Sequence, residues 1–304
     1  MRIALHVLLF LAFPPLLQGI INRVKARFAG RRGPPVLQLY FDLWKLLRKS
    51  AVYSNTTTWI FRAGPPVGLA ALLVAALLLP LGGGLPAPMA FPGDVVLFAY
   101  LLGASRFATV LAALDTGSSF EGMGASREVT FSALAEPALF LSIAALALAR
   151  GSISWTSVLS GQMQVWHLFG PALVMLIAAL LLVALAENSR IPFDDPNTHL
   201  ELTMVHEVMV LDHSGPDLAL ILYGASLKLF LLGAIVVRLA FPFEASFAGH
   251  LLLFLAGMVV FAVVVGIVES TFARLRMNRI PQILIAASVF AALAVAVILI
   301  RVNA

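Results

Sequence analysis

Two basic side chains stand within long apolar runs, where a charge has no water to solvate it. If those runs form helices that begin at Asp94 and Asp217, Arg106 lies about 18 Å along the first and Lys228 about 16 Å along the second. Each such charge costs roughly 2.5 to 3.5 kcal/mol to insert into a bilayer, so it needs a partner, water or a function. Acids near the ends of neighbouring apolar runs could join these charges through water: Glu128, Glu136 and Glu269.

These charges allow two interpretations. In the first, Arg106 and Lys228 pair with Glu136 or Glu128 only to hold helices together, as buried ion pairs often do. In the second, the acids form a wet path for protons that enters the bundle through Glu136 and Lys228. The sequence leaves both open.

A long polar stretch, residues 187–217, is the second feature with chemical potential, because it holds seven of the fifteen acidic residues. Prolines at 192 and 196 predict an extended or turned segment at its start. Thr198 and Glu201 have the spacing of a capping box, which predicts a short helix from about His199 to Leu211. The acids that could lead a proton path from this stretch toward the membrane are Glu187, Glu201, Glu207 and Asp212.

Histidines in this stretch invite a metal-site interpretation, which the spacing does not support. His199, His206 and His213 recur every seven residues, about 10.5 Å along a helix, which is too far for one ion to bridge neighbours. His206 and Glu207 begin like a zinc-protease motif, but Val210 stands where the second ligand would be. We therefore predict no metal site and no active site in this chain.

Composition places the whole chain in a membrane. It is 61% hydrophobic and 12% charged, with a mean hydropathy of +0.99. The net charge of +5 sits beside apolar spans, so membrane topology explains it better than nucleic-acid binding. The chain has no cysteine and cannot ligate an iron–sulfur cluster.

The apolar runs predict an all-α integral membrane protein with about eight transmembrane helices, forming a single domain over residues 1–304. The spans begin near Ile3, Gly64, Asp94, Phe131, Val165, Asp217, Phe247 and Pro281. The basic segment after the first span predicts a cytoplasmic side, and alternation then predicts cytoplasmic loops at 22–62, 115–130, 187–216 and 271–280. Both termini would lie outside. Residues 36–47 predict a short amphipathic helix along the cytoplasmic membrane surface.

Several stretches carry a family resemblance. The segment ENSRIPFDDPNTHLELTMVHEVMVLDHSG resembles the signature loop of the membrane-anchor subunit of formate hydrogenlyase and related energy-converting nickel–iron hydrogenases. That subunit is the counterpart of the quinone-chamber subunit of respiratory complex I, whose loop reaches its Ser-Gly about three residues sooner. Further resemblances are the Arg31–Pro34 run, GASREVTFSALAEPAL, LILYGASLK and VESTFARLR.

The resemblance implies a membrane subunit of a bacterial or archaeal cytoplasmic (inner) membrane complex that couples electron transfer to proton or sodium movement. The implied partners are hydrogenase large and small subunits, a ferredoxin-like iron–sulfur subunit and an antiporter-like membrane subunit. The nickel–iron centre and iron–sulfur clusters would lie in those partners. The residues expected to dock or brace the peripheral arm are Arg31, Arg32, Arg190, Asp194, Asp195, Arg274 and Arg276. Among them, Arg190 would orient the loop by pairing with Glu187, Asp194 or Asp195.

Three alternatives remain at this point. The chain could be the quinone-site subunit of a complex I-type NADH dehydrogenase, although the longer loop argues against it. It could be a stand-alone ion channel or transporter, which the large loop disfavours. It could also be an anchor without any coupling role, which would differ only in ion flux.

Overall fold

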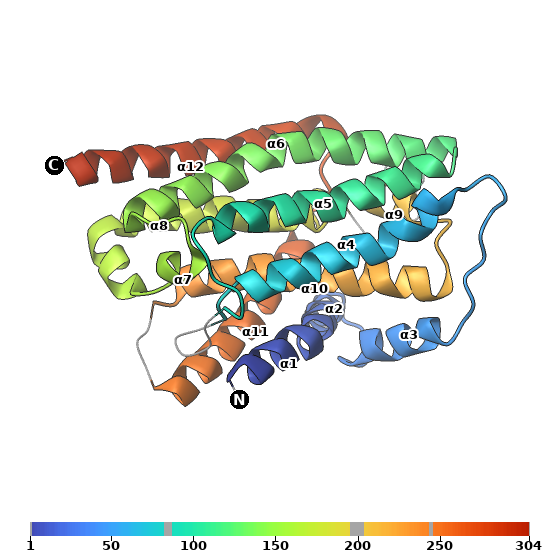
Figure 1. The fold of residues 1–304 in the computed structure, drawn as a ribbon, viewed down its shortest axis with the longest axis horizontal. Coiled ribbons are helices and arrows are strands. Elements are labelled where there is room, and N and C mark those ends of the chain that lie inside the picture. Colours follow the sequence, from blue (N-terminus) through green and yellow to red (C-terminus); the bar gives the residue numbers. More distant parts are fainter. Residues whose placement is uncertain (1, 82–86, 195–203, 243–245, 304) are drawn as a thin grey trace.

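Helices make up the fold in a computed structural model that describes residues 2–81, 87–194, 204–242 and 246–303 (Figure 1). They are α1 (Arg2–Ala12), α2 (Pro14–Phe28), α3 (Gln38–Leu47), α4 (Trp59–Leu78), α5 (Asp94–Asp115), α6 (Ser119–Arg150), α7 (Trp155–Val158), α8 (Gln162–Glu187), α9 (His206–Met209), α10 (Gly215–Ala240), α11 (Phe247–Thr271), the short 3₁₀ helix η1 (Met277–Arg279) and α12 (Ile280–Asn303).

Seven of these helices are long and apolar enough to span a membrane: α4, α5, α6, α8, α10, α11 and α12. α1 and α2 pass the same test as a pair bent by 41°, which brings the number of spans to eight. The bend falls at Phe13, just before two prolines that occupy the first turn of α2. The prediction of an all-α membrane protein with about eight spans is confirmed.

The spans α4 and α6 begin earlier than the sequence predicts. α4 starts at Trp59 because the Thr58 hydroxyl caps it, accepting from Ile60 N, while Asp115 accepts from the backbone of Thr58 and Phe61. α6 starts at Ser119, so most of the predicted loop 115–130 is helical. The predicted amphipathic helix is present as α3, with Tyr40 donating its hydroxyl hydrogen to the Ala12 carbonyl.

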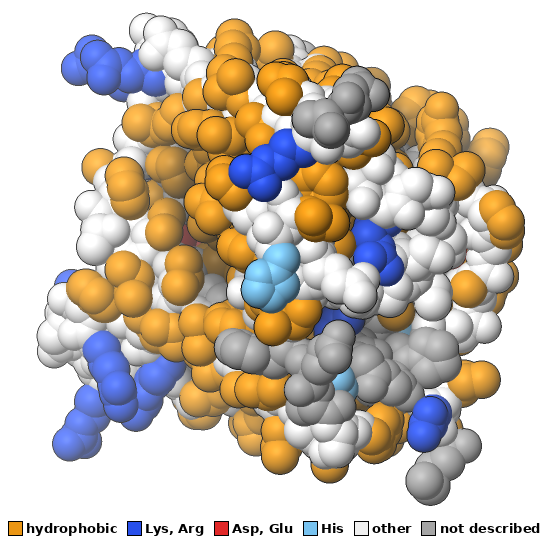
Figure 2. Space-filling view, turned by 90° about the vertical axis from the view of Figure 1, so that its left-hand side faces the viewer, with side chains coloured by type: hydrophobic (Ala, Val, Ile, Leu, Met, Phe, Trp, Pro, Cys, Tyr) orange, Lys and Arg blue, Asp and Glu red, His pale blue; other side chains and the backbone are white. Residues whose placement is uncertain are grey.

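The two chain ends lie at the same end of the bundle. The Arg2 guanidinium sits 5.3 Å from the ring centroid of Phe247 at the start of α11. Arg301, near the end of α12, donates to the Leu168 carbonyl in the first turns of α8. Figure 2 views this end and shows scattered Lys and Arg among hydrophobic side chains, with almost no Asp or Glu visible. The opposite end carries α3 and α9 (Figure 1).

Small residues let α4 and α5 approach each other closely. A Cβ atom added at Gly64 of α4 would lie 2.7 Å from the Ala112 Cβ of α5. At the far end, Asp94 accepts from Trp155 N (2.7 Å) and from the Ser154 hydroxyl (3.0 Å), which ties α5 to α7. α5 is therefore held firmly at its start and packed tightly against α4, and it carries Arg106 between these regions.

Candidate functional site: buried charges beside two cavities

Four charged side chains from four different spans meet inside the bundle. Arg106 Nη1 of α5 lies 2.9 Å from Glu136 Oε1 of α6, and its Nη2 lies 3.2 Å from Glu187 Oε1 of α8. Lys228 Nζ of α10 lies 2.8 Å from Glu187 Oε2. We call Arg106, Glu136, Glu187 and Lys228 the central cluster. In this cluster, Arg106 and Lys228 have the carboxylate partners that the sequence analysis expected buried basic residues to need.

The charges of the central cluster balance, with two cations facing two carboxylates. Glu187 is the junction, because its side chain is 2% exposed and contacts both cations: Arg106 reaches both of its oxygens, and Lys228 pairs with Oε2. Charges withdrawn from water in this way persist only when they are paired and hydrogen-bonded. Removing any one member therefore leaves a buried charge with one partner fewer.

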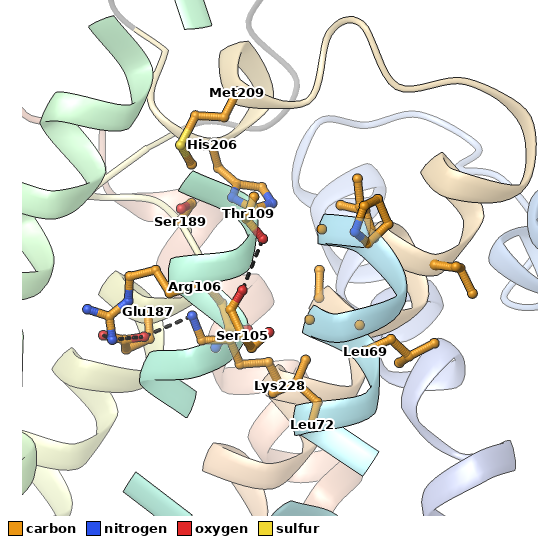
Figure 3. Close-up of a pocket in the computed structure, with 18 of the residues that line it drawn as sticks. Leu69, Leu72, Ser105, Arg106, Thr109, Glu187, Ser189, His206, Met209 and Lys228 are labelled. Atoms are coloured by element: carbon orange, nitrogen blue, oxygen red, sulfur yellow. Dashed lines mark hydrogen bonds and ion pairs between the residues drawn. The ribbon is translucent and has the colours of Figure 1, made fainter. Parts of the chain in front are cut away.

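A cavity of about 70 Å³ adjoins the central cluster. Figure 3 shows it between Arg106, Glu187 and Lys228, the α4 residues Leu69 and Leu72, and His206 with Met209 from the α9 segment. Polar side chains for which the sequence predicted no place beside these charges also line it: Ser105, Thr109, Asn188, Ser189 and His206. Since a water molecule takes up about 30 Å³ in the liquid, a cavity of this volume has room for about two water molecules.

A second, smaller cavity of about 20 Å³ lies toward Phe193 and Asp194. Glu128 and Glu187 line both cavities and so lie between them. Glu187 is held by two cations, whereas none of the ion pairs among the described residues includes Glu128, which is 8% exposed. Glu128 is therefore the carboxyl group between the cavities that can gain or lose a proton without breaking an ion pair.

A tight turn after α8 separates Glu187 from Arg190. Ser189 has a positive φ of 48°, and Arg190 N donates back to the Leu185 carbonyl (2.9 Å). This reversal aims Arg190 away from the central cluster. Arg190 Nη1 pairs with Glu269 Oε1 of α11 (3.1 Å), its Nη2 donates to Gln18, and Lys25 Nζ lies 2.7 Å from Glu269 Oε2.

This second cluster corrects two predictions. Arg190 pairs with Glu269 rather than with Glu187 or Asp194, and at 8% exposure it is buried rather than displayed for docking. Glu269, whose side chain is fully buried, lies with Lys25 and Arg190 instead of lining either cavity beside the central cluster. The physical reason is the turn, which a linear sequence does not reveal.

Asp194 is also buried and acts within the chain. Its Oδ2 accepts from Val205 N (3.0 Å) and His206 N (3.2 Å), and its Oδ1 lies 2.7 Å from Arg274 Nη2. The expected Arg partner is therefore Arg274, and the predicted docking role of Asp194 is replaced by one that fixes the start of α9. Through His206, Asp194 positions one wall of the larger cavity.

The described part of the predicted helix 199–211 is only α9, and Asp195, His199 and Glu201 lie outside the described residues. Withdrawal from water lowers the pKa of His206, and the nearby Glu207 carboxylate opposes this only in part. Over the described ranges, no group of three or more His, Asp or Glu residues could hold a metal ion. The expected site residues that lie partly or fully at the surface are Glu207, Asp212, Arg31, Arg32, Arg274 and Arg276.

Comparison with known proteins agrees with this architecture. The family model described as NADH dehydrogenase matches residues 1–301. This chain belongs to that family. Within the family, the chain is 35% identical to hydrogenase-4 component C of Escherichia coli over 88% of its own length and 86% of the relative's. It is 34% identical to formate hydrogenlyase subunit 4 of E. coli, covering 95% of both chains.

Other family members stand further away. The NADH-ubiquinone oxidoreductase chain 1 of Triticum aestivum is 26% identical over 74% of this chain and 71% of the relative. A solved structure of a membrane-bound sulfane sulfur reductase, an archaeal respiratory membrane complex, contains a chain of the same fold. The TM-score is 0.84, with 21% identity and 98% of each chain covered. The predicted resemblance to the hydrogenase branch of this family is confirmed.

Proposed function

We propose that this chain is the membrane subunit of a nickel–iron hydrogenase complex like formate hydrogenlyase, where it anchors the peripheral hydrogenase arm and couples electron transfer to proton movement. The names of the two E. coli relatives support the type of complex. The central cluster and its cavities support coupling beyond simple anchoring. The nickel–iron centre and the clusters that feed it would lie in partner chains, because this chain has no cysteine.

The observation that carries the coupling role is the position of Glu128. It lies between two cavities that are lined in part by polar side chains, beside a charge-balanced cluster, and outside every ion pair of the described residues. A proton added to it changes the net charge next to Glu187 and Lys228. In a low-dielectric interior such a change is felt strongly by neighbouring charges. Glu128 is thus suited to transmit a charge change between the two cavities.

A membrane partner is supported by Glu136. This side chain sits in the middle of α6, is 44% exposed, and pairs with the buried Arg106. A carboxylate at that depth would be costly against lipid, so a neighbouring subunit with polar groups is the fitting cover. An antiporter-like membrane subunit, to which protons would pass, meets that need.

The end of the bundle with α3 and α9 would face the cytoplasm of a bacterial or archaeal cell, with both termini outside. Most of the 20 Lys and Arg residues belong to segments at that end, which supports this orientation. Arg31, Arg32 and Arg276 are exposed there and would meet the peripheral arm. Movement of that arm would reach the central cluster through Arg274, Asp194 and the turn at 187–194.

The test is Glu128→Gln in the complex purified from native membranes. We expect partner hydrogenase chains to co-purify and hydrogen-linked dye reduction to continue, while proton movement in reconstituted vesicles falls at least tenfold. Asp42→Asn, at a carboxylate of α3 far from the cavities, is the matched control and should leave both activities unchanged. Unchanged proton movement in Glu128→Gln would refute the coupling role. Quinone-dependent activity with quinone-reductase partner chains would move the protein to the complex I branch.

A further inference from the structure

One buried acid takes no part in either cluster or cavity. Glu121, in the first turn of α6, is 1% exposed. Its Oε1 accepts from Asp212 N at 3.3 Å, in the segment that links α9 to α10. Its Oε2 is buried and has no hydrogen-bond partner among the described residues. Half of this carboxyl group is therefore without a donor that would stabilise a negative charge.

Burial and the facing carboxylate favour the neutral form of Glu121. From the 210–214 segment, the facing charge is the Asp212 carboxylate, which repels an anion. From α5, the Thr116 hydroxyl can donate to Glu121, which favours the anion, but its single hydrogen is also within reach of the Ala113 carbonyl (2.7 Å), so the two acceptors compete for it. Its remaining lone pair can accept a hydrogen from a protonated carboxyl group.

Among the described residues, no cation forms an ion pair with Glu121. The Asp115 carboxylate is occupied by the start of α4. Arg127, on the next turns of α6, donates to the Met204 carbonyl and to the Met123 sulfur. The N-terminal end of α6 does favour a negative charge, but that effect is smaller than the penalty for burying an unpaired carboxylate.

We propose that Glu121 holds a proton in the resting state and exchanges it with water beside Asp212 when the 210–214 segment moves. Its bond to Asp212 N links its protonation to the position of that segment, and the exposed Asp212 gives the route to water. Glu121 would thus be a proton-exchange residue at the α3 and α9 end of the bundle, separate from Glu128. Only its use in ion movement rests on the proposed function.

The test is infrared difference spectroscopy of the native complex through pH steps and exchange into D₂O. We expect a buried carboxylic acid band at neutral pH in the wild type that is lost in Glu121→Gln. In Asp212→Asn the band should remain, and its loss should occur roughly one pH unit lower, because a repelling charge has been removed. An unchanged spectrum in Glu121→Gln would overturn the proposal, as would a band whose titration ignores Asp212→Asn.

Thermal unfolding gives a second readout that does not depend on band assignment. A protonated Glu121 stabilises the fold less as pH rises, because the unfolded chain loses its proton at lower pH than the folded chain. The wild type should therefore lose stability toward alkaline pH relative to Glu121→Gln. A wild type that gains stability toward alkaline pH relative to this variant would overturn the proposal.

These measurements separate this proposal from the proposed function. The infrared band and the melting curves report on Glu121 whatever chains co-purify. A band lost in Glu121→Gln together with quinone-reductase partners would support the Glu121 proposal and refute the hydrogenase assignment. A band unaffected by Glu121→Gln would refute the Glu121 proposal, while loss of proton movement in Glu128→Gln would still support the proposed function.

Discussion

Glu187→Gln is the most direct perturbation of the central cluster, because Glu187 is the carboxylate of that cluster that both cations share. Arg106 keeps Glu136 at 2.9 Å after this change, but Lys228 loses its only ion pair among the described residues. Breaking a buried pair costs about 3 to 5 kcal/mol. The Gln carbonyl still accepts a hydrogen bond from Lys228, so we expect the lower end, about 3 kcal/mol. At roughly 2 °C per kcal/mol for a chain of this size, the melting temperature should fall by about 6 °C.

The cost should depend on which partner is left behind. In Lys228→Met, Glu187 retains Arg106 at 3.2 Å, so we expect less than half the loss seen in Glu187→Gln. The double variant carries no unpaired lysine and should be more stable than Glu187→Gln alone, with a coupling energy of about 1 to 3 kcal/mol. The assay is thermal unfolding of the complex in mild detergent. Additive losses in the double variant, or a smaller loss in Glu187→Gln than in Lys228→Met, would refute the pairing argument.

Three further predictions concern the surroundings of the site. Burial lowers the pKa of His213, whose ring stacks on that of Phe61 with 4.0 Å between the centroids. The contribution of His213 to stability is therefore complete above about pH 6.5 and falls as pH drops below that value. Between pH 7.5 and 5.5 the melting temperature of His213→Phe should fall less than that of the wild type, and equal losses would contradict this. Gly124→Ala should lower the free energy of unfolding by about 1 to 3 kcal/mol, because the added Cβ would lie 2.3 Å from an α9 side chain. Gly122→Ala, whose Cβ would have nothing within 4 Å, should be neutral or stabilising. Melting curves of the two variants test this. Asp115→Ala should cost about 1 to 2 kcal/mol by uncapping α4, and faster hydrogen exchange confined to the first turn of that helix would identify the cause.

The hydropathy pattern predicted the number and approximate place of the spans because length and apolarity alone decide which helices can cross a bilayer. It misplaced the start of α6, since polar residues at 119–128 are typical of a loop in an isolated sequence. In the fold, that part of α6 supports the α9 segment: Arg127 binds the Met204 carbonyl, and Gly124 allows close contact. Tertiary packing, which is invisible to periodicity, explains the polar residues there.

The members of the site and the Arg106–Glu136 pair were predictable, but the pairing of Lys228 with Glu187 was not. The sequence pointed to Arg106, Lys228, Glu128 and Glu136, because a charged side chain in or beside a membrane span needs an opposite charge or water wherever it lies. The choice of Glu187 as their shared partner depends on how α8 ends. The sequence did not predict a cavity-lining role for His206, because its place on the cavity wall follows from Asp194, which fixes the backbone of the α9 segment.

The turn that follows α8 gives the two charge clusters a common support. Glu187 belongs to the central cluster, Arg190 to the pair with Glu269, and Asp194 to the bonds that hold α9 and Arg274. A displacement of this turn therefore cannot relieve one set of contacts without straining the others, since each contact is a short ion pair or charge-assisted hydrogen bond. A disturbance at the surface near Arg274 would thus reach the cavities through the backbone of eight residues, by contacts that are all present in the described chain. Arg274→Ala, which removes the outermost of these contacts, should therefore change the pH dependence of proton movement in the intact complex. A pH profile identical to the wild type would show that the turn is a passive support.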